Sequence, residues 1–256
     1  MTGLVTVLGS GTSMGVPTVG CQCPVCLSDD PRDKRTRPSL LVQYGGRNVV
    51  VDTTPDFRFQ AMRAGLRRLD AVLFTHSHAD HILGLDDVRP FNFIQKSEVP
   101  VYGSRSTIDR IRHVFDYIFD GSYPFGGLPQ VCANVLEGPI ELFGARITPV
   151  PVLHGRMEVF GYLFGRCAYL TDYSRIPDAS APLLRDLDVL FLDALRHEPH
   201  PAHCTVEQAL AYAEILRPRQ AFLTHIAHDL GHEQTNATLP GNVRLCYDGM
   251  QLEIEL

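Results

Sequence analysis

The stretch His76-Ser77-His78-Ala79-Asp80-His81 places three imidazoles and a carboxylate within six residues. It directly follows the apolar run 70–75, which has the composition of a buried β-strand. Imidazole and carboxylate together are ligands that zinc, manganese and iron(II) accept in proteins. A tight turn after the strand can direct such side chains to two adjacent metals rather than to one. The stretch therefore predicts a metal site at a strand end and, with it, a hydrolase.

Length, composition and net charge limit the classes of protein to which the chain can belong. The chain has 256 residues, of which 45% are hydrophobic, and we expect a single domain over residues 1–256. The net charge of −6 argues against a protein that holds long nucleic acid by its phosphates, but not against a small phosphate ester as substrate. No apolar run approaches the roughly 20 residues that span a bilayer, and residues 1–7 lack the pattern of a signal peptide. We therefore expect a cytoplasmic protein without membrane attachment, and the sequence leaves a homodimer possible.

Short apolar segments dominate the rest of the chain. They predict a dozen strands, at 4–8, 40–44, 48–51, 71–75, 99–102, 145–152, 160–164, 167–171, 189–193, 221–224, 243–247 and 251–255. Helical periodicity is confined mainly to 55–66, 106–119, 179–186 and 205–216. This mixture favours two packed sheets with helices outside over a doubly wound parallel sheet. The segment 120–138, rich in glycine and proline, is predicted to be an irregular excursion of the kind that often covers a site.

Three more predicted strands end on a ligand-type side chain. His154 closes the first, Asp172 follows the second and His225 follows the third. A lone His or Asp at a strand end is more often a turn or cap residue. If the strands lie side by side, however, their ends share one rim of the fold. Seven metal-binding groups then converge there.

The cysteines suggest a second metal site. Three of the seven lie in Cys21-Gln22-Cys23-Pro24-Val25-Cys26, and the other four are scattered. An odd total makes a disulfide framework a poor explanation, whereas C-x-C-x-x-C spacing more often holds a metal whose fourth ligand comes from elsewhere. A redox-active cysteine pair, or reactive loop thiols, is the alternative.

The order of these ligand-type residues resembles the metallo-β-lactamase-fold hydrolases, over nearly the whole chain. The resemblance implies an α/β (α+β) fold, an αββα sandwich of two mixed β-sheets with helices on the outer faces, and two metals at one edge between the sheets. It implies the following assignment: His76, His78 and His154 to the first metal, Asp80, His81 and His225 to the second, and Asp172 as the bridge between them.

The opening 8–17, the cysteine cluster and the run 223–228 narrow this resemblance. Together they are similar to the phosphonate-pathway (PhnP-like) cyclic phosphodiesterases, which are related to the tRNA 3′-processing endonucleases. In that family three cysteines and a histidine bind a structural zinc, which implies these ligands here: Cys21, Cys23, Cys26 and His228. Such a zinc would tie the polar loop at about 9–38 to the C-terminal part of the sheet. Gly9-Ser10-Gly11 does not make a dinucleotide-binding fingerprint, because no helix follows and Pro17 interrupts the pattern.

The charge of two bound metal ions would favour hydrolysis by a metal-bound hydroxide. Two divalent ions, zinc or manganese, roughly 3.5–4 Å apart would lower the pKa of a shared water, so that hydroxide becomes available as the nucleophile. Asp80 could also orient that hydroxide. The leaving alkoxide still needs a proton, and hence a general acid.

His203 is the candidate general acid. His203-Cys204-Thr205 resembles the short histidine motif that precedes a helix in the phosphodiesterase and the tRNA nuclease. Thr205 is then the expected N-cap of the 206–216 helix. His197 and His200 are expected to face solvent or to line the rim of the substrate site.

We therefore expect a metal-dependent phosphodiesterase acting on small, cyclic phosphodiesters. A tRNA 3′ endonuclease is the alternative within enzymes, but the flexible basic arm typical of such nucleases is not visible, since 104–120 balances its arginines with aspartates. A thioester or lactam hydrolase could use the same metal centre, though those branches lack the cysteine cluster. A non-catalytic carrier or accessory protein in cofactor biosynthesis also stays open, because some members of the fold have lost part of the metal site. All seven ligands are present here.

Overall fold

A computed structural model describes residues 1–121 and 126–256, and its described strands form two seven-stranded sheets. The strands of the first sheet are β1 (Thr2–Gly9), β2 (Ser39–Tyr44), β3 (Arg47–Val51), β4 (Ala71–Leu73), β5 (Val99–Gly103), β6 (Val131–Val135) and β14 (Gln251–Glu255). Those of the second are β7 (Ile140–Leu142), β8 (Ala145–His154), β9 (Met157–Phe164), β10 (Cys167–Leu170), β11 (Val189–Asp193), β12 (Gln220–Thr224) and β13 (Val243–Leu245). The sheet orders are β14-β1-β2-β3-β4-β5-β6 and β13-β12-β11-β10-β9-β8-β7.

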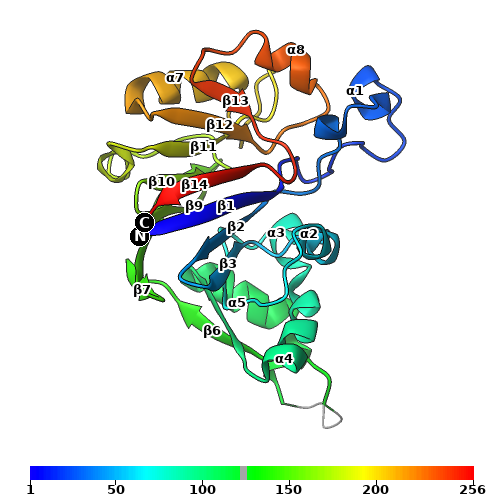
Figure 1. Ribbon diagram of the computed structural model, residues 1–256, viewed down its shortest axis with the longest axis vertical. Helices are drawn as coiled ribbons and strands as arrows, with labels where there is room; N and C mark the ends of the chain where they lie inside the picture. The colour runs from blue at the N-terminus through cyan, green and yellow to red at the C-terminus, as the bar shows by residue number, and fades with distance from the viewer. Residues whose placement is uncertain (122–125) are drawn as a thin grey trace.

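Helices cover the outer faces of both sheets (Figure 1). The α-helices are α1 (Pro24–Leu27), α2 (Phe57–Arg63), α3 (Ala79–Ile82), α4 (Arg89–Gln95), α5 (Arg105–Val114), α6 (Asp116–Phe119), α7 (Val206–Leu216) and α8 (His232–Asn236), with 3₁₀ turns η1 (Pro31–Asp33), η2 (Leu85–Val88) and η3 (Ala181–Leu184). Helices α2 to α5 lie on the first sheet, and α7 and α8 lie on the second. The expected αββα arrangement is confirmed.

The side chains of a strand alternate between its two faces, and this alternation divides the buried core into two clusters. Val49 and Val51 of β3 belong to the cluster between the two sheets, whereas Val50 belongs to the cluster under α2 to α5. Successive side chains of a strand point to opposite faces, so a strand buried on both faces reads as a continuous apolar run. This burial makes β3 and its neighbours a rigid support for whatever follows their ends.

Strand direction brings several strand ends to one rim. Strands β3, β4, β5 and β6 are mutually parallel, as are β10, β11, β12 and β13. Strand β8 runs in the same direction as β10, because both pair antiparallel with β9. Gly11, just beyond β1, bridges to Ile226, just beyond β12, so the two sheets present their ends on the same side. The loop that carries α1 stands beside this rim (Figure 1).

Three expectations about local structure need correction. The segment 120–138 is not irregular throughout, because β6 pairs in parallel with β5 as an edge strand; residues 122–125 of that segment lie outside the described residues. The helix expected at 179–186 is only the turn η3, where Pro182 permits a start but a single side chain, Leu184, is buried. The helix expected at 106–119 is broken at Phe115, whose φ of −113° and ψ of 40° leave helical geometry.

Thr205 is the N-cap of α7 as expected, and it forms a capping box with Gln208. Within the described residues, no helix has both the length and the apolar character needed to cross a bilayer.

Candidate metal centres

Four strands deliver the sequence-predicted ligands to the rim. His76 and His78 come shortly after β4, and His154 is the last residue of β8. Asp172 lies two residues beyond the end of β10, and His225 directly follows β12. The remaining two, Asp80 and His81, belong to the single turn of α3 that follows the loop after β4. The structure therefore brings together side chains from both sheets.

Three of these imidazoles form a first group of ligand atoms. The donor atoms of His76, His78 and His154 all lie within 4.8 Å of one another, and Nε2 of His76 is 2.9 Å from Nδ1 of His78. Nδ1 of His154 donates to the carbonyl oxygen of Ala202 at 2.7 Å. That bond fixes the proton on Nδ1, so Nε2 of His154 keeps a free lone pair for a metal.

The other four residues form a second group. Ligand atoms of Asp80, His81, Asp172 and His225 also lie within 4.8 Å of one another. Nε2 of His81 is 3.3 Å from a carboxylate oxygen of Asp80 and 3.3 Å from Oδ1 of Asp172. Nε2 of His225 is 3.2 Å from Oδ2 of Asp172. Two carboxylates and two imidazoles thus surround one point.

Asp172 lies between the two groups. Its Oδ2 is 3.9 Å from Nε2 of His76 in the first group, while both of its oxygens face the second group. Because Oδ2 lies near imidazoles of both groups, this carboxylate suits the bridging role that the family resemblance implies.

Left-handed backbone recurs where strands end at the rim. Asp172 has φ of 53° and His225 has φ of 59°, and Asp52, directly after β3, has φ of 64°. Left-handed backbone is uncommon outside glycine, and it persists where the surrounding structure enforces it. Because the same conformation ends β3, β10 and β12, each strand end turns sharply and leaves its side chain at the rim.

Two further carboxylates act behind the predicted ligands, and sequence reasoning missed both. Asp52 accepts from Nδ1 of His81 at 2.7 Å, and Thr75 holds it with a backbone and a side-chain hydrogen bond of 2.8 Å each. Asp193, the last residue of β11, accepts from Nδ1 of His203 at 2.7 Å. Such outer partners fix the orientation and tautomer of an imidazole. Both residues carry the signal that identified Asp172, an aspartate at the end of an apolar strand.

Electrostatics favour a cation at the second group. Burial lowers the pKa of His81, but the carboxylates of Asp172, Asp52 and Asp80 outweigh it and hold that pKa well above its usual value. The pKa of His225 is raised to about 9, because Asp172 outweighs the opposing effect of burial. Burial raises the pKa of Asp172, yet His225 and His81 bring it well below its usual value. The carboxylates of Asp172 and Asp80, whose pKa values are both lowered, are therefore ionised and attract positive charge.

The donor atoms also fit divalent ions. Nε2 of His81 and Nε2 of His225 are buried, and within the described residues neither makes a hydrogen bond of good geometry, although carboxylate oxygens lie 3.2–3.3 Å away. A buried polar atom without a partner is costly, and a metal bond would satisfy both atoms. The imidazole and carboxylate donors suit zinc or manganese.

His203 lies against both groups. Its ring stacks on His225 with centroids 4.4 Å apart and meets His154 edge-on at 4.6 Å. One of its nitrogens is within 4.8 Å of ligand atoms of His154 and Asp172. Next to it lies His200, whose ring centroid is 5.0 Å away, while His197 is exposed and pairs with Glu207. His203 is thus placed for contact with a substrate at the rim.

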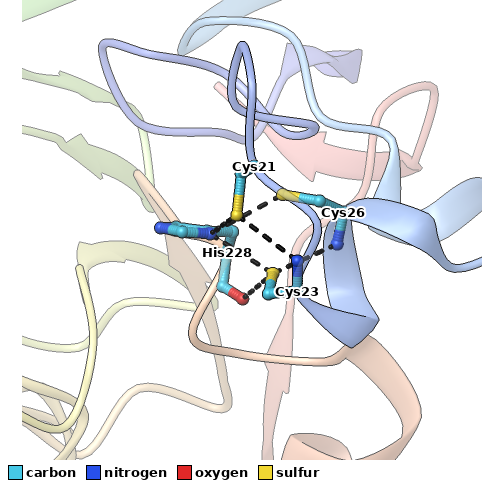
Figure 2. Close-up of side chains that lie close together, drawn as sticks. All are labelled: Cys21, Cys23, Cys26 and His228. Carbon is cyan, nitrogen blue, oxygen red and sulfur yellow. Dashed lines mark hydrogen bonds between the residues drawn. The ribbon is translucent and has the colours of Figure 1, made fainter.

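A separate group of four donors lies beside the rim. The sulfur atoms of Cys21, Cys23 and Cys26 surround Nδ1 of His228 at 3.2, 3.3 and 3.6 Å (Figure 2). Tetrahedral zinc with ordinary Zn–S and Zn–N bonds puts sulfur and nitrogen about 3.5 Å apart. We call these four residues the thiolate site. The structure brings together the set that the sequence predicts.

The thiols differ in their readiness to ionise. The backbone N–H of Cys26 donates to Cys23, which lowers the pKa of the Cys23 thiol to about 6 despite some burial. Burial raises the pKa of Cys26 to about 11. One thiolate is therefore present at neutral pH, and a metal would displace the proton of Cys26.

Comparison with known proteins places the chain in a family. The family described as "Beta-lactamase superfamily domain" matches residues 47–226. The crystal structure of a new diphosphatase from the PhnP family is 54% identical in sequence, covers 99% of this chain and 98% of its own, and superposes with a TM-score of 0.93. Zinc-bound PqqB from Methylobacterium extorquens has 20% identity and a TM-score of 0.77, covering 97% and 99% of the two chains, which shows a shared fold alone.

Curated relatives are similar over less of their length. An octanoyltransferase from Porphyromonas gingivalis is 38% identical over 97% of this chain but 51% of its own length. A ribonuclease Z from Bradyrhizobium diazoefficiens is 32% identical over 52% of this chain and 46% of its own. The chain thus spans about half the length of these curated relatives. With 54% identity over almost the full length of both chains, the protein belongs to the PhnP family within the metallo-β-lactamase-fold superfamily.

Proposed function

We propose that this chain is a metal-dependent hydrolase of small phosphoric diesters, cyclic ones included. The observation that carries the proposal is the position of Asp172 between two groups of ligand atoms, with His203 against both. Seven donors at one rim exceed what a single ion needs, and the imidazole of His203, which is not one of the seven, lies beside them as a proton donor.

The metals would supply the electrophilic part of the reaction. Two divalent ions at this rim would lower the pKa of water toward neutrality and neutralise charge on phosphoryl oxygens. We assign His76, His78 and His154 to one ion, Asp80, His81 and His225 to the other, and Asp172 to both. The chain itself orients these donors, with Ala202 holding His154 and Asp52 holding His81.

His203 is assigned to the leaving group. Its Nδ1 donates to Asp193, so Nε2 is the nitrogen from which a proton would pass to the leaving oxygen. Asp193 also stabilises the charged imidazole, which needs to be protonated before it donates. An alkoxide leaving oxygen requires this proton far more than an aryl oxide does, because the alkoxide is the stronger base.

A phosphorus substrate is favoured by the comparisons and by the cysteine cluster. The PhnP-family protein at 54% identity is named a diphosphatase, so a diphosphate linkage is our second candidate. A tRNA endonuclease is less favoured, since the ribonuclease Z relative matches only 52% of this chain and the net charge is −6. The octanoyltransferase name belongs to a protein of about twice this length and is not carried over.

The test is a substrate panel with the full chain loaded with manganese or with zinc. The panel contains 2′,3′-cyclic nucleotides, ribose cyclic phosphates, an activated aryl diester, a dinucleoside diphosphate, a thioester and a tRNA precursor. We expect kcat/KM for a cyclic diester at least about 100-fold above that for the thioester, a transition-state preference of about 2.7 kcal/mol. An Asp172→Asn preparation controls for contaminating phosphatases.

The outcomes separate the candidates. Preference for the dinucleoside diphosphate over every diester would favour the diphosphatase assignment. Cleavage of the tRNA precursor alone would favour the endonuclease. A chain that binds three metals yet cleaves no phosphorus substrate would contradict the proposal and support a carrier role.

A further inference from the structure

One short segment carries a ligand of each metal site. His225 belongs to the rim and His228 to the thiolate site, and the segment has neither helix nor strand, since β12 ends at Thr224 and α8 begins at His232. The backbone of such a segment needs other hydrogen-bond partners, because buried carbonyls without partners are costly. Residues 225–231 are therefore held from outside.

The main support is a buried arginine. Arg35 is the largest of the fully buried side chains, and its side chain has no exposed surface. Its Nη1 donates to the carbonyl oxygen of Ala227 at 3.0 Å, and its Nη2 donates to that of Leu230 at 2.7 Å. These two carbonyls lie on either side of His228. One guanidinium thus binds the backbone before and after the thiolate-site histidine.

Asp33 completes the arrangement. Its Oδ1 accepts from Nη2 of Arg35 at 2.8 Å and from the backbone N–H of His232 at 2.9 Å. The carboxylate balances the buried charge, which would otherwise be expensive. Together Arg35 and Asp33 contact the segment at residues 227, 230 and 232, and we call this pair the Arg35–Asp33 clamp.

Backbone hydrogen bonds connect the clamp to both metal sites. Arg35 pairs with Val16 through backbone hydrogen bonds of 2.7 and 2.8 Å, which connects it to the loop that carries the cysteines. On the other side of the segment, Ile226 donates to Ser10 and its carbonyl accepts from Thr12. The residue between His225 and the clamped Ala227 is therefore fixed as well.

We propose that the Arg35–Asp33 clamp is the positioning device that holds His228 ready for the thiolate site and, through Ile226, steadies His225 at the rim. The inference rests on the metal assignment made above. A planar guanidinium is needed because its fork of donors reaches two carbonyls and a carboxylate at once. A lysine has a single ammonium group on a flexible chain and leaves at least one of these carbonyls unpaired.

Metal binding to the thiolate site tests this directly. Metal-free protein is titrated with Co²⁺, whose thiolate bonds give an absorption band specific to this site, and bound Co²⁺ is then displaced by Zn²⁺. We expect Arg35→Lys to weaken zinc binding at the thiolate site by about 10- to 100-fold, the range seen when outer partners of metal ligands are removed. Arg32→Lys is the matched control, because Arg32 joins the same two segments through an exposed ion pair with Glu233.

A second variant with its own control tests the clamp if Arg35→Lys does not fold. Asp33→Asn weakens the clamp and keeps an oxygen for His232, and its control is Asp30→Asn, which removes a partly exposed ion pair in the same loop. We expect Asp33→Asn to lose at least about threefold in zinc affinity, equivalent to about 0.7 kcal/mol. Asp30→Asn is expected to match the wild type.

Three results would overturn the proposed role of the clamp. A role confined to fold stability would lower the melting temperature of Arg35→Lys and leave its zinc affinity within about twofold of the wild type, and this would overturn the proposal. Equal losses in a clamp variant and its control would do the same. Absence of the cobalt–thiolate band in the wild type would overturn both the clamp and the thiolate-site assignment, but it would leave the rim chemistry standing, because the substrate panel tests that independently.

Discussion

The rim and the thiolate site both gather metal-binding side chains but are built differently. The rim takes its side chains from the ends of β4, β8, β10 and β12, which lie in both sheets and are fixed by the packing between them. The thiolate site takes three of its four donors from the loop around α1, where little apolar surface is buried. The register of the strands therefore places the rim ligands before any metal binds. The positions of the three cysteines depend more on the bound metal.

Their partners differ in the same way. Each rim group has carboxylate or carbonyl oxygens behind or beside its imidazoles, including Asp52, Asp172 and the carbonyl of Ala202. The thiolate site has three sulfurs and one nitrogen, with no carboxylate among its four donors. A closed set of four donors is typical of structural zinc, whereas a catalytic centre keeps room for water and substrate. The donors of the rim therefore suit a catalytic centre, and those of the thiolate site suit a structural zinc.

The largest expected effect follows from removing the bridge. Asp172→Asn takes away the charge that both ligand groups share, so both ions should bind weakly. We expect kcat/KM to fall by more than about 1,000-fold, about 4 kcal/mol in transition-state stabilisation. Elemental analysis should find the thiolate-site zinc retained. Loss of all metals together would contradict the independence of the two sites.

His203→Ala separates proton transfer from metal binding. The variant should keep its metals, and it should lose about 100-fold or more in kcat on diesters with alkyl leaving groups. On an activated aryl diester the loss should be much smaller, because aryl oxide leaves without a proton. Equal losses on the two substrates would argue against a general acid at this position.

Asp52→Asn tests the layer behind the rim ligands. An amide still fills the space, but its neutral oxygen is a weaker acceptor for Nδ1 of His81. We expect a loss of about 10- to 100-fold in affinity for one rim metal, with activity restored at high metal concentration. Asp56→Asn is the matched control, since Asp56 pairs with Arg37 outside both metal sites. Equal behaviour of the two variants would show that Asp52 serves the fold alone.

These residues also show what the sequence could and could not predict. The rim ligands were predicted because each is a His or Asp at or just beyond the end of an apolar run, and the structure brings all seven together. Asp52 and Asp193 end runs of the same kind, but their roles depend on which strands are neighbours. Strand β3 lies beside β4, and β11 lies between β10 and β12. That order is a long-range property that local periodicity does not contain.

Arg35 was missed for a different reason. Arginine is among the residues least often fully buried, so composition and pattern place it at the surface. Only the tertiary structure shows that its donors meet the carbonyls of Ala227 and Leu230, almost 200 positions along the chain.

The smallest expected effect on turnover comes from the thiolate site. Cys23→Ser removes the thiol with the lowered pKa, so zinc at this site should be lost or held weakly. A loss of about 2.5 kcal/mol in unfolding free energy would lower the melting temperature by about 5–10 °C, since each kcal/mol is worth roughly 2–4 °C in a chain of this size. With the rim metals loaded, kcat should stay within about threefold of the wild type, because a structural zinc takes no part in the chemistry. Cys132→Ser, at an exposed cysteine outside the cluster, is the control. A drop in kcat as large as that of His203→Ala, without loss of rim metals, would mean that the thiolate site shapes the reacting centre itself.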